Sequence, residues 1–348
     1  MDILINPFRG QSDAMPALQD VPMPSVDAAT PLALMSRCPE AAVTPLISVP
    51  DLARRCDVGE VLIKDERARM ELGSFKALGA AYVIAHAASH GDLSDVTYVT
   101  ASAGNHGLSV AAGAAAFGAN AVVYIAETVP ESFAARLRDQ GAEVVREGST
   151  YEDSMAAAAA GGERNGWQLL SDSSWPGYFQ HPHRLMEGYL VLMAEIAAQI
   201  AAPPSHIFLQ AGVGGLAGAV AAMARDVWHD QPLIVVVEPS AAPALAASIA
   251  AGAPVRADGP VSVMGRLDCK EPSLIALRGL ARDADAFATI SEGEAVQGDE
   301  LAADHGLAST PSGAAGLAGL LASAPHRGDF GLDDTSRVLL ILSEGPEA

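Results

Sequence analysis

The sequence predicts a two-lobed α/β protein built on mainly parallel sheets that are flanked by helices. Three observations predict this class: short β-branched runs recur along the chain, helical stretches separate them, and each run is apolar enough to be buried on both faces. Strands that alternate with helices form parallel sheets with right-handed crossovers. A chain of 348 residues, 50% of them hydrophobic, is long enough for two sizeable cores.

The expected strands are, in chain order, "EVLIK", "VTYVT", "AVVYIA", "AEVVRE", "WQLLS", "HIFLQA", "PLIVVVE" and "SRVLLILS". Residues 88–190 carry four of them at close spacing and are expected to form a small mobile domain. Residues 46–87 and 191–348 then form a large domain, and the proline-containing residues 1–45 form an N-terminal arm over a core. Parallel sheets bind ligands beyond the carboxyl ends of their strands, so the functional loops are expected to follow strands.

Composition excludes several classes of protein. Lys and Arg total 21 against 42 Asp and Glu, and the resulting net charge of -21 repels nucleic-acid backbones and anionic membranes. The N-terminus lacks the basic start and apolar core of a signal peptide. Cys38, Cys56 and Cys269 are odd in number and widely spaced, which indicates neither a disulfide framework nor a metal site. A cytoplasmic protein without a bound metal is expected.

The first loop of interest contains Lys76, in "ELGSFKALGAAYVI". This lysine follows a strand and the Gly73 turn and stands near a helix start, where the helix dipole disfavours a cation. Together with burial, the dipole is expected to lower the pKa of Lys76 and to leave a nucleophilic amine. For a lone lysine the alternative is a side chain whose stem lies along the core while its ammonium reaches water.

The second loop is "TASAGNHG", which follows a strand and begins a helix. Free N–H groups at a helix start attract an anion such as a carboxylate, and the small residues Ser102, Ala103 and Gly104 allow it to approach closely. The Asn105 amide is placed to bond a ring hydroxyl, although Asn is also an ordinary N-cap. His106 is as consistent with a core histidine as with a functional one.

The third loop is "LQAGVGGLAGAVAAM", where three glycines leave backbone N–H groups accessible to a phosphate. Gly212, Gly214 and Ala217 also satisfy the dinucleotide pattern G-x-G-x-x-A, and Glu238 ends the next strand where a ribose-binding acid is expected. Taken alone, this loop supports a nicotinamide-dependent oxidoreductase equally well.

The three loops together favour pyridoxal 5'-phosphate as the cofactor. A reactive lysine, a carboxylate site and a phosphate site are what an enzyme needs to hold this cofactor and an amino acid. A dehydrogenase has no use for Lys76 in this setting.

Several motifs resemble one known family. "GSFKALGAAY", "SAGNHG", "QAGVGGLAG" and "VVVEP" are similar to the tryptophan-synthase-β-like, fold type II class of pyridoxal phosphate enzymes. "TPLISVPDLARRCDVGEVLIKDE", "YEDS", "SDSSWPGY", "MGRLDCKEPS" and "SGAAGLAGLL" resemble diaminopropionate ammonia-lyase in order and spacing, from about residue 44 onward.

This resemblance implies a role for each candidate residue. Lys76 forms the Schiff base with the cofactor, and Asp172 is the acid/base carboxylate for L-substrates, although an Asp in such a loop is otherwise a common cap or turn residue. Ser343 faces the pyridine nitrogen, where a neutral hydroxyl favours prompt β-elimination over transamination. The remaining implied contacts are Asn105 to the ring hydroxyl, Gly212, Val213, Gly214, Gly215 and Leu216 to the phosphate, and Ser102, Ala103, Gly104 and His106 to the substrate.

The implied function is α,β-elimination of a small β-substituted L-amino acid similar to 2,3-diaminopropionate, giving a 2-oxoacid and ammonia. Two departures qualify it. Ala103 replaces the Asp that the lyases use on D-substrates, and Ser102 with Ala103 matches the L-serine and L-threonine dehydratases, so a dehydratase acting on these or on 3-hydroxyaspartate is the alternative. Met70 and Glu71 replace the family's usual aromatic-glycine pair. A third hypothesis is a binding protein of this fold that has no catalytic activity. The resemblance also implies a homodimer. No residue of the sequence indicates a ligand for a monovalent cation.

Overall fold

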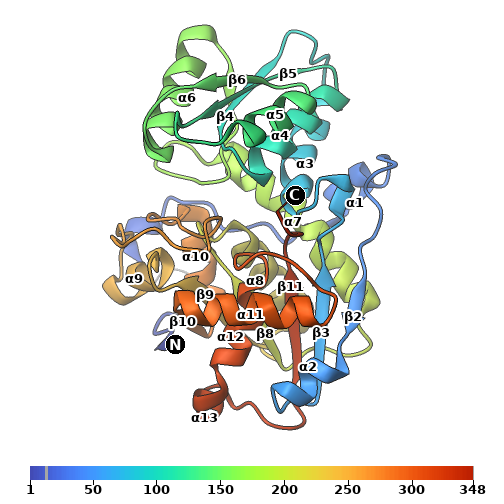
Figure 1. The fold of residues 1–348 in the computed structure, drawn as a ribbon, viewed down its shortest axis with the longest axis vertical. Helices are drawn as coiled ribbons and strands as arrows, with labels where there is room; N and C mark the ends of the chain where they lie inside the picture. The colour runs from blue at the N-terminus through green and yellow to red at the C-terminus, as the bar shows by residue number, and fades with distance from the viewer. Residues whose placement is uncertain (12–14, 348) are drawn as a thin grey trace.

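The computed structural model describes residues 1–11 and 15–347 and contains two β-sheets, which lie one above the other in Figure 1. The larger sheet has seven strands in the order β1-β10-β9-β8-β11-β3-β2. Its edge strands β1 and β2 run antiparallel to their neighbours, and the five strands between them are parallel. Its strands are β1 (Asp2–Ile5), β2 (Leu46–Ser48), β3 (Glu60–Asp65), β8 (His206–Gln210), β9 (Leu233–Pro239), β10 (Ala286–Ile290) and β11 (Arg337–Leu342).

The smaller sheet has four parallel strands in the order β6-β5-β4-β7 and lies at the top of Figure 1. Its strands are β4 (Thr97–Ala101), β5 (Asn120–Ile125), β6 (Glu143–Arg146) and β7 (Gln168–Leu169). All four fall within residues 97–169.

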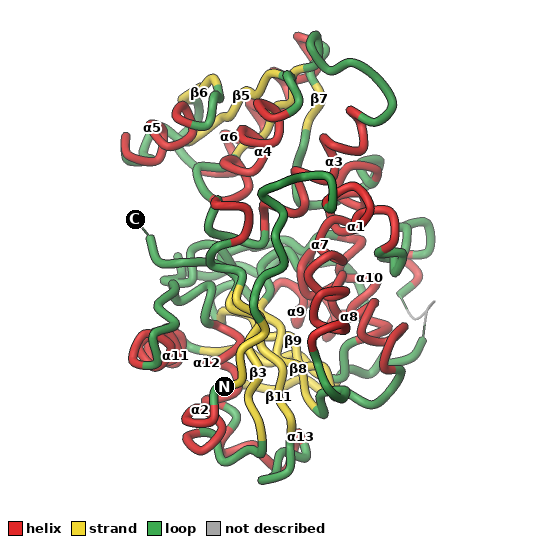
Figure 2. Tube along the Cα trace, turned by 90° about the vertical axis from the view of Figure 1, so that its right-hand side faces the viewer, coloured by secondary structure: helices red, strands yellow, loops and turns green. Residues whose placement is uncertain are grey.

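Helices cover both faces of each sheet. Around the larger sheet, α7, α8 and α10 lie on one face and α2, α11 and α12 on the other (Figure 2). The helices are α1 (Ala29–Met35), α2 (Pro50–Arg55), α3 (Lys76–Ala88), α4 (Asn105–Ala116), α5 (Glu131–Asp139), α6 (Tyr151–Asn165), α7 (Gln180–Gln199), α8 (Gly215–Trp228), α9 (Ala244–Ala251), α10 (Leu274–Asp283), α11 (Glu292–Asp304), α12 (Ala315–Ala322) and α13 (Arg327–Phe330). Short 3-10 turns occur at Pro16–Leu18, Arg69–Glu71 and Ala324–His326.

The α/β class and the mainly parallel sheets predicted from the sequence are confirmed, and each expected strand overlaps an observed one. Three further strands were not expected: β1, β2 and β10. Residues 2–5 of the predicted arm pair with β10 as the edge strand β1. The predicted boundary between residues 190 and 191 falls inside α7, whose buried side chains belong to a hydrophobic core that also includes residues of β4 and β5.

Local sequence explains several element ends. Thr150 and Asp153 form a reciprocal capping box at the start of α6, and Gly166 ends this helix in the left-handed conformation. Ser291 and Glu294 form the same box at the start of α11. The described part of the chain contains no helix that is long and apolar enough to cross a membrane.

Candidate active site

The loop between β3 and α3 places Lys76 at the first residue of α3. Gly73 turns this loop with a φ of +77°, a left-handed conformation that favours glycine. The N–H of Phe75 donates to the carbonyl of Ser343 at 3.1 Å, and the N–H of Gly345 donates to the carbonyl of Gly73 at 3.0 Å. The chain that follows β11 therefore holds the lysine loop in place.

Asp172, in the loop after β7, is the ion-pair partner of Lys76. The Lys76 Nζ donates to Oδ2 of Asp172, and the two side chains are 22% and 17% exposed. Burial alone lowers the pKa of Lys76, but the Asp172 carboxylate and Tyr189 outweigh burial and raise it. Burial alone raises the pKa of Asp172, but the charges of Lys76 and His106 lower it overall.

The expectation that helix start and burial lower the pKa of Lys76 is therefore wrong. Its partner lies 96 residues further along the chain, and only the folded structure shows the two together. In this arrangement the amine holds a proton and the carboxylate is ionised.

The loop after β4 is folded tightly onto the start of α4. The Oγ of Ser102 accepts a hydrogen bond from the N–H of Gly104 at 3.3 Å. A Cβ at Gly107 would lie 2.1 Å from the Ser102 carbonyl, so glycine is required there. Ser102, Ala103 and Gly104 are partly exposed and lie beside the start of α4, whose first N–H groups have no partner within the helix.

Asn105, the first residue of α4, is fixed by Glu344. Its Nδ2 donates to Oε2 of Glu344, and the other carboxylate oxygen accepts from Oγ1 of Thr310. Arg266 Nε lies 2.9 Å from Oε2 as an ion pair whose angle does not suit a hydrogen bond. Burial raises the pKa of Glu344, although Arg266, Thr310 and Asn105 oppose that rise. The sequence analysis did not identify Glu344. Its position directly after Ser343, at the end of a strand, could have indicated it.

His106 is buried beside the ion pair. Its Nε2 lies 2.9 Å from the carbonyl of Leu170, which assigns the ring proton to Nε2. Nδ1 is then an acceptor, and it is buried with no partner among residues 1–11 and 15–347. Burial and the charge of Lys76 lower the pKa of His106 against the pull of Asp172, so the ring is neutral near pH 7.

The glycine loop after β8 leads directly into α8. Gly214 has a φ of +97°, and a Cβ there would lie 3.0 Å from Cβ of Ala276. A Cβ at Gly212 would lie 3.0 Å from Sγ of Cys269. The Cβ position of Gly215 is 3.9 Å from the carbonyl oxygen of Asp172. The start of α8, a helix end whose N–H groups attract anions, is therefore next to the Lys76 and Asp172 pair.

Val213, Leu216 and Ser343 are the remaining residues that the sequence predicts to bind the cofactor. The carbonyl of Val213 accepts from the N–H of Ser273 at 2.9 Å, which ties this loop to the start of α10. Leu216 is buried behind the loop, 6% exposed. Ser343 directly follows β11 and is 5% exposed, and its N–H donates to the carbonyl of Gly313 at 3.3 Å.

Glu238 is not available to a ribose. It is fully buried, and its two carboxylate oxygens accept from the N–H groups of Leu245 and Ala246, both at 2.8 Å. These bonds cap α9, so the acid of the dinucleotide pattern has a structural role here.

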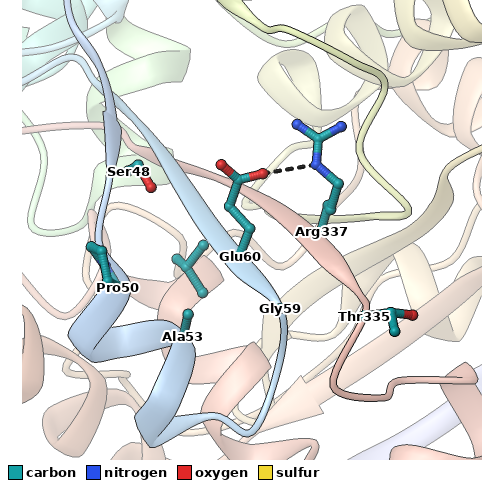
Figure 3. Close-up of a pocket in the computed structure, with 8 residues that line it drawn as sticks. Ser48, Pro50, Ala53, Gly59, Glu60, Thr335 and Arg337 are labelled. Atoms are coloured by element: carbon teal, nitrogen blue, oxygen red, sulfur yellow. Dashed lines mark hydrogen bonds and ion pairs between the residues drawn. The ribbon is translucent and has the colours of Figure 1, made fainter.

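A cavity of about 370 Å³ lies at the opposite end of the larger sheet. Gly59 and the paired Glu60 and Arg337 line part of it (Figure 3). This cavity lies at the amino ends of β3 and β11, whereas ligand sites of parallel sheets lie at the carboxyl ends. No group of three or more His, Cys, Asp or Glu side chains in the described ranges is arranged to hold a metal ion.

Comparisons with known proteins agree with this geometry. Residues 38–344 match the family described as pyridoxal-phosphate dependent enzyme. The chain is 32% identical to the diaminopropionate ammonia-lyase of Salmonella typhimurium over 90% of its own length and 88% of the relative's. It is 30% identical to the human serine dehydratase-like protein over 69% of each chain.

Solved structures give the same result. The holo diaminopropionate ammonia-lyase of Escherichia coli superposes with a TM-score of 0.89 at 28% identity, covering 99% of this chain and 93% of the other. The same Escherichia coli enzyme has been solved with an aminoacrylate-PLP azomethine reaction intermediate. A threonine deaminase isoform from Solanum lycopersicum, 21% identical with a TM-score of 0.82, shares the fold.

Proposed function

The chain belongs to the pyridoxal-phosphate dependent enzymes and, within them, to the diaminopropionate ammonia-lyase family, and from this premise we propose that it converts L-2,3-diaminopropionate to a 2-oxoacid and ammonia. The observation that carries the proposal is the pair of Lys76 and Asp172, held beside the glycine loop that begins α8. A nicotinamide-dependent reaction is excluded by the family and by the capping role of Glu238.

The residues present fit pyridoxal phosphate. The start of α8 offers backbone N–H groups to a phosphate, and Gly212 and Gly214 let this loop pack tightly against Cys269 and Ala276, where a side chain would clash. A lysine amine and two buried groups without partners, His106 Nδ1 and the Tyr189 hydroxyl, lie around the same space. Unpaired buried polar atoms are rare in proteins, so their concentration here supports a bound polar molecule.

Each loop then has one task. Gly212, Val213, Gly214, Gly215 and Leu216 bind the phosphate group. Asn105, fixed by Glu344, orients the ring through its hydroxyl, and Ser343 faces the ring nitrogen. When bound, the cofactor supplies an electron sink for the electron pair of a broken Cα–H bond.

The substrate carboxylate is bound at the start of α4, where Ser102, Ala103 and Gly104 lie beside the N–H groups of the helix and His106 lies behind them. Lys76 and Asp172 move protons: the ionised carboxylate accepts one, and the lysine amine, once free, accepts or donates one. Asp172 is the acid/base group for the L-isomer, whose Cα proton it or Lys76 removes.

Ala103 is the basis for the expected L-selectivity. Its methyl group cannot move a proton, whereas the lyases that act on D-isomers have an Asp in this place. Ala103→Asp is therefore expected to add turnover of D-2,3-diaminopropionate without loss of folding. A folded Ala103→Asp variant with no D-isomer turnover contradicts this account.

A dehydratase is the second candidate, and the sequence "SAGNHG" favours it. Ser102 and Ala103 match the L-serine and L-threonine dehydratases, and the chain resembles a serine dehydratase-like protein. The leaving group is then a hydroxyl rather than an amine.

The experiment that tests the proposal measures 2-oxoacid release by the cofactor-loaded protein. The substrates are L- and D-2,3-diaminopropionate, L-serine, L-threonine and the 3-hydroxyaspartate isomers, with Lys76→Ala as the control. Release from L-diaminopropionate and little from its D-form is expected. Release from hydroxy-amino acids alone replaces the lyase by the dehydratase, and no release from any substrate supports the silent binding protein.

The same family also supports a homodimer in the cytoplasm with a small domain, residues 88–190, that moves against the large one. Light scattering on the purified protein tests the dimer. A mass of one chain contradicts it.

A further inference from the structure

Tyr189, on α7, lies between the lysine helix α3 and the glycine-loop helix α8. Its side chain is buried, with 1% exposed. A Cβ added to Gly79 of α3 would lie 2.8 Å from Cε1 of Tyr189, and the Cβ position of Gly215 is 3.6 Å from Cε2. The ring also packs edge-on against Phe75, with 4.9 Å between the centroids. These contacts hold the ring, and hence its hydroxyl, in one place.

The hydroxyl of Tyr189 is buried and makes no hydrogen bond of normal geometry in the described part of the chain, although Lys76 lies close enough to act on it. Such a group costs stability, and a phenylalanine would fill the same space without that cost. Tyr178 shows the usual arrangement, because its hydroxyl donates to the carbonyl of Leu169 at 2.7 Å and accepts from the N–H of Ser171 at 3.0 Å. The unpaired hydroxyl of Tyr189 therefore indicates a function rather than a packing need.

Lys76 is the cation that acts on the Tyr189 hydroxyl, through its charge and through a weak hydrogen bond. Both side chains pack on Phe75, whose ring centroid lies 5.3 Å from the Lys76 Nζ. Burial raises the pKa of Tyr189 although the charge of Lys76 opposes the rise, so the phenol is neutral near pH 7. A lysine ammonium has three N–H donors, and the bond to Asp172 uses one of them.

We propose that Tyr189 is a positioning residue whose phenol oxygen accepts a hydrogen bond from Lys76 when that nitrogen has taken a proton from the substrate. The inference rests on the proposed function. In that step the Cα–H bond breaks, its proton forms an N–H bond on Lys76, and the electron pair left on carbon expels the β-substituent. The buried ammonium that results needs a second acceptor besides Asp172, and Tyr189 supplies it.

The other titratable groups around Lys76 are uncharged near pH 7, apart from Asp172. Burial raises the pKa of Cys269 to about 12, and Tyr151 is an exposed phenol that is neutral near pH 7 as well. Burial lowers the pKa of His106. With Asp172 neutralised by substitution, the phenol is therefore the main group left to stabilise the ammonium.

The test measures the pKa of Lys76 by NMR in protein labelled at lysine Cε. The chain has three lysines, Lys64, Lys76 and Lys270, so each signal is assignable by substitution. In an Asp172→Asn background the carboxylate charge is gone, and burial brings the Lys76 titration into a measurable range. Adding Tyr189→Phe is expected to lower the Lys76 pKa by a further 0.5 to 1 unit, roughly the effect of one neutral hydrogen bond.

Tyr98→Phe in the same background is the matched control, because Tyr98 is a buried phenol, 1% exposed, on β4. It is expected to leave the Lys76 titration unmoved. A Lys76 titration that Tyr189→Phe also leaves unmoved overturns the proposal. These titrations do not depend on turnover. Their result therefore tests the role of Tyr189 separately from the 2-oxoacid assay that tests the proposed function.

Two further measurements separate a positioning role from a structural one. Cofactor-free Tyr189→Phe is expected to keep or raise the melting temperature, by about 1 to 2 °C, because an unpaired buried hydroxyl is removed. In the loaded enzyme kcat is expected to fall about tenfold while KM stays within about twofold. A lower melting temperature would mean that the Tyr189 hydroxyl has a structural role. Weaker pyridoxal phosphate binding together with an unchanged Lys76 pKa would mean that the hydroxyl contacts the phosphate. Either result overturns the proposal.

Discussion

Two of the lysines that contact carboxylates, Lys64 and Lys76, lie in different surroundings. One belongs to a buried ion network below the lysine loop, which consists of Thr44, Lys64, Glu66, Arg69 and Glu195. The other is Lys76, paired with Asp172. Each site places opposite charges together away from bulk water, so the difference between them lies in the remaining polar groups.

The buried ion network is saturated with hydrogen bonds. All three guanidinium nitrogens of Arg69 donate, to Glu66, Glu195, Thr44 and a backbone carbonyl. The Nζ of Lys64 donates to the Thr44 carbonyl at 2.7 Å and lies 2.7 Å from Glu195. Beside Lys76, in contrast, a phenol and an imidazole nitrogen have no partner within the described residues. A saturated network stabilises a fold, whereas spare buried donors and acceptors indicate a place where a substrate or cofactor completes the set.

Neutralising the carboxylate of the unsaturated pair is expected to change the reaction most. Asp172→Asn should slow elimination by about 10² to 10⁴-fold, the usual contribution of an acid/base group, while cofactor absorbance is retained. The buried carboxylate of Glu195 gives the matched control, because Glu195→Gln should keep kcat per folded molecule and lose stability instead. Steady-state kinetics and urea unfolding of both variants make the comparison. Unchanged turnover in Asp172→Asn removes this residue from the mechanism.

Breaking the saturated network is expected to have the largest effect on stability. Arg69→Met leaves Glu66 and Glu195 buried with one cation fewer, and the free energy of unfolding should fall by about 3 to 5 kcal/mol. Arg54, whose side chain is 73% exposed and pairs with Asp51, is the control. Arg54→Met should cost no more than about 1 kcal/mol. Equal losses in the two variants would mean that the network is not the stabilising element.

Glu238 shows what a buried acid does without a cation. Its hydrogen bonds come from two backbone N–H groups, and burial raises its pKa to about 8, whereas Arg69 and Lys64 lower the pKa of Glu195 despite burial. A pKa that is higher in the folded chain than the ordinary value of 4.5 means that the folded state binds the extra proton. Stability from this group is therefore complete below about pH 4.5 and is lost as the pH rises through about 8.

The predicted slope is a loss of about 1.4 kcal/mol of unfolding free energy per pH unit between pH 5 and pH 8. Glu238→Gln carries a neutral side chain at every pH and should remove this part of the slope. Urea unfolding of both proteins at pH 5, 6, 7 and 8 measures the difference. Parallel curves for the two proteins would show that Glu238 is ionised in the folded state throughout this range.

The sequence was sufficient for the parts of the fold and site that depend on local pattern. Buried parallel strands read as continuous apolar runs, and the loops that follow them carry small residues and glycine, so Lys76, Asn105 and Gly214 were found at the starts of helices. The edge strands β1 and β2 were missed because they are short and gain their order from a neighbour in the sheet, β10 or β3.

Long-range partners were not predictable in the same way. The charge state of Lys76 depends on Asp172, and the position of Asn105 depends on Glu344, 239 residues later in the chain. The buried hydroxyl of Tyr189 has no pattern of its own, since a tyrosine in an apolar helix face reads as core. These contacts form when the folded chain brings loops from the two sheets together, so the spacing of residues in the sequence does not predict them.

The loop that carries Lys76 also differs from the saturated network in its backbone. Glu71 has a φ of +56°, a left-handed conformation that costs an L-residue about 1 to 2 kcal/mol, and the resemblance described above implies a glycine in this place. Its side chain is exposed, so little packing is lost on its removal. Glu71→Gly should therefore raise the free energy of unfolding by about 0.5 to 1 kcal/mol, after the greater freedom of glycine in the unfolded chain is subtracted. Glu71→Ala removes the same charge but keeps Cβ, and urea unfolding should find it no more stable than the wild type. An equal rise in the free energy of unfolding of both variants would show that loss of the Glu71 carboxylate causes the gain. The backbone of the lysine loop would then not be strained at this residue.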